Sequence, residues 1–74
     1  MKIKTVNVIE YVDDSILGLT SFNDDQEGNQ EAKELFKTLN KEHDSEVTEN
    51  ELGLACQEGY YEQGNYQLFL VHSS

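Results

Sequence analysis

The acidic segment 23–34 carries oxygen side chains spaced like those of a calcium loop. Five of its residues match the first, third, fifth, sixth and twelfth positions of the EF-hand pattern: Asn23, Asp25, Glu27, Gly28 and Glu34. Oxygen ligands alternate along such a loop, glycine allows the sharp bend, and the last glutamate binds bidentately. However, the pattern prefers Asp to Asn at its first position, and the preceding residues resemble a strand. We therefore expect no metal here and keep a calcium-binding domain as an alternative.

Cys56 is the only cysteine and the only thiol nucleophile of the chain. His43 or His72 could serve as its base. Cys56, however, falls on the apolar face of a predicted helix, where free cysteine usually acts as a small buried hydrophobe. The two histidines and the cysteine also lack zinc-like spacing. We expect Cys56 and His43 to contribute to packing, with no cofactor.

Catalytic motifs are absent from the sequence. It contains no phosphate loop, no nucleophile elbow and no dinucleotide fingerprint. Carboxylates are so numerous that no pair stands out as an acid and base. We therefore assign no catalytic residue and expect a protein that is not an enzyme.

The charge of the chain is strongly negative. Fifteen Asp and Glu oppose five Lys, which gives a net charge of −10 over 74 residues. Nucleic acids and anionic membranes are bound through Lys and Arg, so neither is an expected direct partner. A protein partner with a basic surface is expected, and acidity that serves only solubility is the alternative.

Acids are densest in the middle of the chain. Between Asp24 and Glu58 there are eleven acids and three lysines. In size and charge the chain resembles the small acidic inhibitors of phages and mobile elements that imitate nucleic acid, although it shares no motif with them. Such a function implies a carboxylate array that occupies a basic surface, and the candidate partner-binding residues on the first helix are Glu27, Glu31 and Glu34.

Aromatic residues gather near the end of the chain. Tyr60, Tyr61 and Tyr66 lie close to Phe69. Because neighbouring strand residues point to opposite faces, at least one of Tyr60 and Tyr61 is expected to be exposed. Tyrosine is favoured at the centres of protein interfaces, so the three tyrosines are candidate partner-binding residues. The alternative is that they complete a small core, and a homodimer through this hairpin or a sheet edge is a further possibility.

Two helices are predicted in the middle of the chain. Apolar residues recur at helical spacing from 29 to 43: Ala32, Leu35, Phe36 and Leu39. Gly28 weakens the first turn, so we expect the regular helix to begin near Asn29. A second helix is expected within 47–59, with Thr48 and Glu51 as a capping box and Gly59 as its end.

Strands are predicted on both sides of the helices, at 2–12, 16–22, 60–63 and 66–72. Asp13-Asp14-Ser15 and Gly64-Asn65 supply the turns, and Gly18 marks a bulge or a close backbone approach. The order ββααββ over 1–74 predicts one α+β domain, a small antiparallel sheet with one long and one short helix on one face. We expect the last strand beside the first, which leaves the short strands at the edges.

The sequence shows no signal of a membrane or export. The apolar residues of the first strand alternate instead of forming a solid signal-peptide core, and no run reaches transmembrane length. With a single cysteine, this indicates a soluble cytoplasmic protein.

Overall fold

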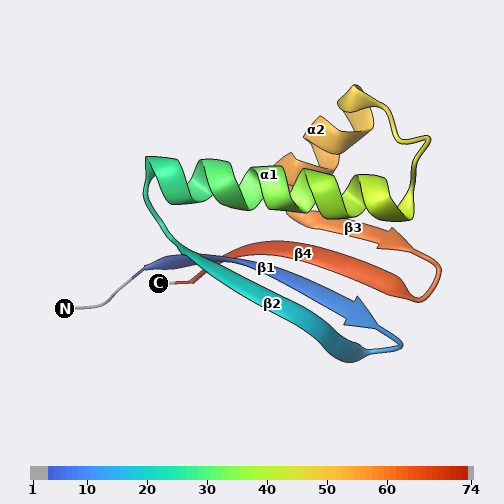
Figure 1. Ribbon diagram of the computed structural model, residues 1–74, viewed down its shortest axis with the longest axis horizontal. Helices are drawn as coiled ribbons and strands as arrows, with labels where there is room; N and C mark the ends of the chain where they lie inside the picture. The colour runs from blue at the N-terminus through green and yellow to red at the C-terminus, as the bar shows by residue number, and fades with distance from the viewer. Residues whose placement is uncertain (1–3, 74) are drawn as a thin grey trace.

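The computed structural model describes residues 4–73 and contains six elements in the order ββααββ. Its elements are β1 (Thr5–Val12), β2 (Ser15–Asn23), α1 (Gln26–His43), α2 (Glu49–Glu58), β3 (Tyr60–Gln63) and β4 (Tyr66–Ser73). The strands form one antiparallel sheet in the order β2-β1-β4-β3 (Figure 1). The predicted α+β fold is thus confirmed. The predicted strand residues Lys2 and Ile3 lie outside the described residues.

The first hairpin has a tight turn and one bulge. Asp13 and Asp14 have φ angles of 52° and 66°, which the short side chains of aspartate tolerate better than most. The β1–β2 register slips between Glu10 and Tyr11, which leaves Leu17 as the extra residue next to Gly18. The bulge predicted at Gly18 is therefore present.

Helix α1 begins earlier than predicted. Its first residue is Gln26, and Asp25 is the N-cap, with Oδ1 accepting from Gly28 N–H at 2.6 Å. A Cβ at Gly28 would lie 1.8 Å from the carbonyl oxygen of Asn23. Gly28 thus permits a close approach between helix and strand, and this packing outweighs its poor helix propensity. The predicted start near Asn29 was wrong for this reason.

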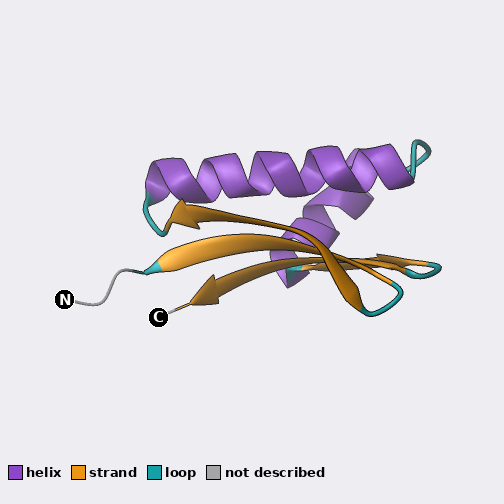
Figure 2. Cartoon of the chain, turned by 60° about the horizontal axis from the view of Figure 1, so that its bottom comes forward, coloured by secondary structure: helices purple, strands orange, loops and turns teal. Residues whose placement is uncertain are grey.

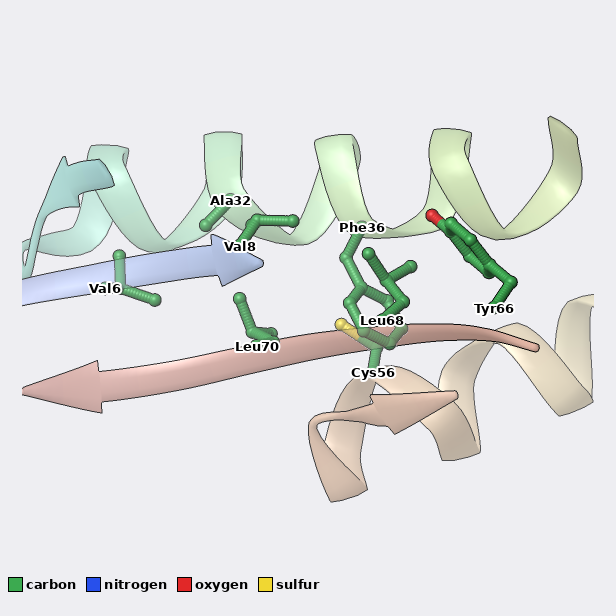
Figure 3. Packing of buried hydrophobic residues seen from close by; sticks show 8 residues of the cluster. All are labelled: Val6, Val8, Ala32, Phe36, Cys56, Tyr66, Leu68 and Leu70. Atoms are coloured by element: carbon green, nitrogen blue, oxygen red, sulfur yellow. The ribbon is translucent and has the colours of Figure 1, made fainter. Parts of the chain in front are cut away.

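The core lies between α1 and the sheet. Figure 2 shows α1 lying along one face of the sheet. Phe36 and Ala32 are fully buried against alternating residues of the two central strands (Figure 3), with Leu35 and Leu39 partly buried beside them. The sheet contributes Val6, Val8, Tyr66, Leu68 and Leu70. The helical spacing seen in the sequence therefore does bury its apolar face.

Helix α2 closes the β3 end of this core. Thr48 and Glu51 form the predicted capping box, and Gly59 ends the helix in the left-handed region with φ of 75°. Leu52 and Cys56 are buried, and Cys56 belongs to the main cluster. Neither helix of the described residues is long and apolar enough to cross a membrane.

The sheet edges differ from each other in length. The short strand β3 forms one edge, as predicted. The other edge is β2, which has nine residues and is the longest strand of the described sheet. β4 lies between β1 and β3, so the continuous apolar run near its middle does mark a central strand.

Candidate functional site

The sheet has a second face that points away from the core. Side chains alternate along a strand, so the residues between the core positions share this face, which we call the open face. It comprises Thr5, Asn7, Ile9 and Tyr11 of β1, Ile16, Leu19 and Ser21 of β2, Tyr60 and Glu62 of β3, and Gln67, Phe69, Val71 and Ser73 of β4.

One half of the open face is apolar. Leu19 lies opposite Ile9, and Phe69 lies opposite Ile9 on the other side. Leu19 is 60% exposed and Val71 is 43% exposed. A hollow of about 340 Å³ lies on this half, lined by Ile9, Tyr11, Asp14, Gln67, Phe69 and Val71. We call this region the apolar half of the open face.

An aromatic row crosses the apolar half from β1 to β3. The ring of Tyr11 meets that of Phe69 edge-on, with centroids 5.5 Å apart. The ring of Tyr60 lies 5.1 Å from Phe69 on the other side and is tilted by 50°. Such pairs hold the rings in place. The row therefore presents a preorganised aromatic surface.

Towards the chain ends the open face is polar. Ser21 donates to Asn7 Oδ1 at 2.6 Å, and the hydroxyls of Thr5 and Ser73 hydrogen-bond to each other. These four side chains satisfy one another, so this half offers little apolar surface. The apolar half is thereby bounded on that side.

Carboxylates border the apolar half at β3 and at the first hairpin turn. Glu62 accepts from Gln67 at 2.9 Å and from the Tyr60 hydroxyl at 2.8 Å, and these hydrogen bonds lower the pKa of the Glu62 carboxyl. Asp14 lines the hollow beside the first hairpin turn. Among residues 4–73, no lysine is on the open face. We call the border formed by Glu62 and Asp14 the rim of the apolar half, and this rim is negative.

The three candidate tyrosines do not share one surface. Tyr66 is only 3% exposed and lies on the core side, where its hydroxyl donates to Glu10 Oε2 at 3.0 Å. Tyr61 is partly buried against the core, and Tyr60 alone is on the open face. The three tyrosines therefore do not form one exposed patch, because strand alternation and the β3–β4 register separate Tyr61 and Tyr66 from Tyr60.

The candidate carboxylates of α1 are exposed. Glu27, Glu31 and Glu34 are spaced along one side of the helix and, with Gln30, line a shallow hollow. Glu34 also borders a second hollow that contains Lys33. The structure thus keeps the three acids together but away from the apolar half of the open face.

The segment 23–34 does not form a calcium loop. Residues from Gln26 onward are helical, and Asp25 uses its carboxylate to cap that helix. Among residues 4–73, no three side chains of His, Cys, Asp or Glu lie close enough together to hold a metal ion. An EF-hand-like site requires a loop over these residues, whereas their backbone is helical from Gln26 onward. The backbone geometry therefore does not support this alternative.

Cys56 and the two histidines have separate surroundings. The Cys56 thiol is buried in the core cluster. The imidazole of His43 stacks on Tyr66 with centroids 3.5 Å apart, and His72 Nε2 lies 2.7 Å from Asn29 Oδ1. Both imidazoles thus contact other side chains, and the described contacts form no nucleophile–base pair.

The aliphatic residues of the open face were not predicted from the sequence. Ile9, Leu19 and Val71 were not proposed as site residues, although β1 and β4 carry apolar residues on both faces. Such two-sided strands are typical of sheets covered on both sides.

Comparisons with models of protein families, with curated proteins and with solved structures give no match.

Proposed function

We propose that this chain is a non-enzymatic protein-binding module that docks a partner on the apolar half of its open face. The observation that supports this most is the exposure of Leu19 and Val71 beside an ordered aromatic row. Soluble monomers seldom leave a contiguous apolar patch uncovered unless it binds something. Aromatic residues are also enriched at interface centres.

The partner's chemistry follows from the rim. Glu62 and Asp14 border the apolar half, and the whole chain carries a net charge of −10. A matching surface has an apolar centre ringed by Lys and Arg, because opposite potentials speed encounter and reject wrong partners. Binding should accordingly weaken as salt rises, since surface charges are screened within about 8 Å at physiological ionic strength.

A second copy of the chain suits this surface less well. A homodimer through the open face would bring together two negative rims and two net charges of −10. Like charges across an interface oppose association. A basic partner relieves that repulsion, which favours a heterologous complex over self-association.

Inhibition by imitation of nucleic acid is a narrower form of the same proposal. It needs carboxylates without intervening cations, whereas Lys33 and Lys37 share a hollow with Glu34. Lys41 also pairs with Glu49 at 3.3 Å. Because these lysines interrupt the carboxylates of α1, the sheet face is the better candidate for the centre of the interface. The acids of the helix then add to the long-range attraction of a basic partner.

The test compares two matched double variants. The open-face variant carries Ile9→Thr and Val71→Thr, which keep strand propensity but remove apolar surface. The helix variant carries Glu27→Gln and Glu31→Gln. Proteins retained by the immobilised wild type are purified and titrated against all three chains at low and high salt.

The open-face variant should lose about tenfold or more in affinity, because central apolar contacts dominate interface energetics. The helix variant should lose less and should flatten the salt dependence. Equal affinity of the wild type and the open-face variant for every retained protein would overturn the proposal.

A further inference from the structure

The edge strand β2 lacks the usual protection against pairing. It has nine residues, SILGLTSFN, with no charged residue and no proline. Figure 1 shows no strand beyond it in the sheet, consistent with its terminal place in the strand order. Edge strands normally avoid pairing through lysine, proline or short length. β2 has none of these, although one bulge lies near its start.

The outward backbone groups of β2 can be identified from the ladder. Asp24 N–H donates to Lys4 C=O at 3.1 Å, which makes these two residues a hydrogen-bonded pair. Antiparallel pairs alternate between bonded and non-bonded. The N–H and C=O groups that point away from β1 therefore belong to Leu19, Ser21 and Asn23. Because the Asn23 carbonyl packs against Gly28 of α1, Leu19 and Ser21 offer the backbone groups for a partner strand.

The two sides of this edge differ in chemistry. On the side that faces α1, a hollow of about 450 Å³ lies where the end of β2 meets the first turns of α1. Its lining includes Glu27, Glu31 and Asp25. On the other side, Leu19 and Ile16 are 60% and 62% exposed. A strand added here would meet carboxylates on one face and apolar side chains on the other.

We infer that β2 accepts an extended segment of a partner protein as a fifth strand, and that this segment alternates Lys or Arg with apolar residues. This inference rests on the proposed function and adds how the partner is held. Because the added side chains alternate faces, the basic ones face Glu27 and Glu31, and the apolar ones extend the apolar half beside Leu19. Backbone hydrogen bonds supply affinity in such strand addition, and the alternate side chains supply specificity.

A second copy of the chain does not fit this edge. Its β2 carries no lysine or arginine, so pairing β2 with β2 would leave the carboxylates of both helices without cations. The charge of the edge therefore selects a basic segment from another protein.

The test is an NMR titration with a defined probe. The probe is a capped eight-residue peptide that alternates Lys and Val, and its control has the same composition arranged in pairs of Lys and pairs of Val. The alternating peptide should shift the backbone amides of residues 19–23 and bind more tightly than the control. Equal binding of both peptides, or shifts confined to residues outside β2 and the first turns of α1, would overturn the inference.

Matched variants test the two components of recognition. Ser21→Pro removes an outward N–H and should abolish binding of the alternating peptide, whereas Ser21→Ala removes only the hydroxyl and should preserve it. Glu27→Gln with Glu31→Gln should weaken binding about fivefold through the loss of two surface ion pairs. Amide spectra of each free variant establish that the fold is retained.

Failure of this inference is distinguishable from failure of the proposed function. If the peptide does not bind to β2 while a retained protein still requires Ile9 and Val71, only the strand addition is wrong. If the peptide binds to β2 while the open-face variant keeps full affinity for every retained protein, the open face is not the docking surface. Binding of the alternating peptide by Ser21→Pro at wild-type affinity also excludes backbone pairing.

Discussion

Ile9 and Leu19 lie directly opposite each other in the β1–β2 ladder, on the face of the sheet that no core residue occupies. Ile9 is half-buried by its neighbours, whereas Leu19 is 60% exposed. Cross-strand apolar pairs of this kind normally face a second layer. The pair therefore marks the place where a partner would supply the missing layer.

Replacing Leu19 should have little effect on folding. Leu19→Thr retains strand propensity and removes only exposed surface, so the free energy of unfolding should change by about 0.5 kcal/mol or less. Leu68→Thr is the matched control, because Leu68 is fully buried, and it should cost about 3 kcal/mol. Urea denaturation measures both. Similar losses in the two variants would show that Leu19 is part of the core.

The same change at two glycines should have opposite effects. Gly28→Ala would place a Cβ 1.8 Å from the Asn23 carbonyl oxygen and should destabilise the protein by more than about 1 kcal/mol. Gly53 has no atom within 4 Å of an added Cβ, so Gly53→Ala should stabilise by about 1 kcal/mol through helix propensity. Thermal unfolding measures the change in melting temperature of each variant. A Gly28→Ala variant as stable as wild type would contradict the close approach.

Asn40 is a buried polar residue whose replacement should be stabilising. Its side chain is fully buried, and neither Oδ1 nor Nδ2 has a hydrogen-bond partner among residues 4–73. An unsatisfied buried polar group costs about 1–3 kcal/mol. Asn40→Leu should therefore raise the melting temperature by several degrees, whereas Asn40→Ala should gain less because it leaves a cavity. A lower melting temperature for Asn40→Leu would indicate that the amide is satisfied.

Tyr66 should make stability depend on alkaline pH. Burial and the hydrogen bond to Glu10 raise the pKa of its phenol well above the ordinary value of 10.0. The folded state thus holds this proton more tightly than the unfolded state does. The stabilisation is complete below pH 10 and declines as pH rises above it. Urea denaturation between pH 8 and pH 12 should show this decline.

Tyr66→Phe provides the control for that pH dependence. It removes the phenol and should cost about 1 kcal/mol at neutral pH through the lost hydrogen bond to Glu10. Above pH 10 the difference between wild type and variant should shrink, since only the wild type has this titrating group. A difference that stays constant from pH 8 to pH 12 would show that Tyr66 titrates normally.

The element order and the core followed from residue spacing. Ala32 and Phe36 recur at helical intervals and are buried, while Val6 and Val8 alternate and face them. The first residue of α1 could not be predicted from residue spacing. The poor helix propensity of Gly28 is visible in the sequence, but its close approach to Asn23 is a tertiary contact that the sequence does not show.

The site was harder to predict than the fold. Alternation shows that Tyr60 and Tyr61 face opposite ways, but only the β3–β4 register and α2 determine which of them faces the core. Likewise, the apolar residues of β1 and β4 indicate a sheet that is apolar on both sides. That one side remains uncovered depends on where both helices pack.

The most direct test is a methyl NMR titration of the protein with a purified partner that it retains. We expect shifts at the methyl groups of Ile9, Leu19 and Val71, with those of the buried Val6 and Leu68 little changed. Shifts confined to residues of α1 and α2, such as Leu54, with Ile9, Leu19 and Val71 unaffected, would contradict this expectation.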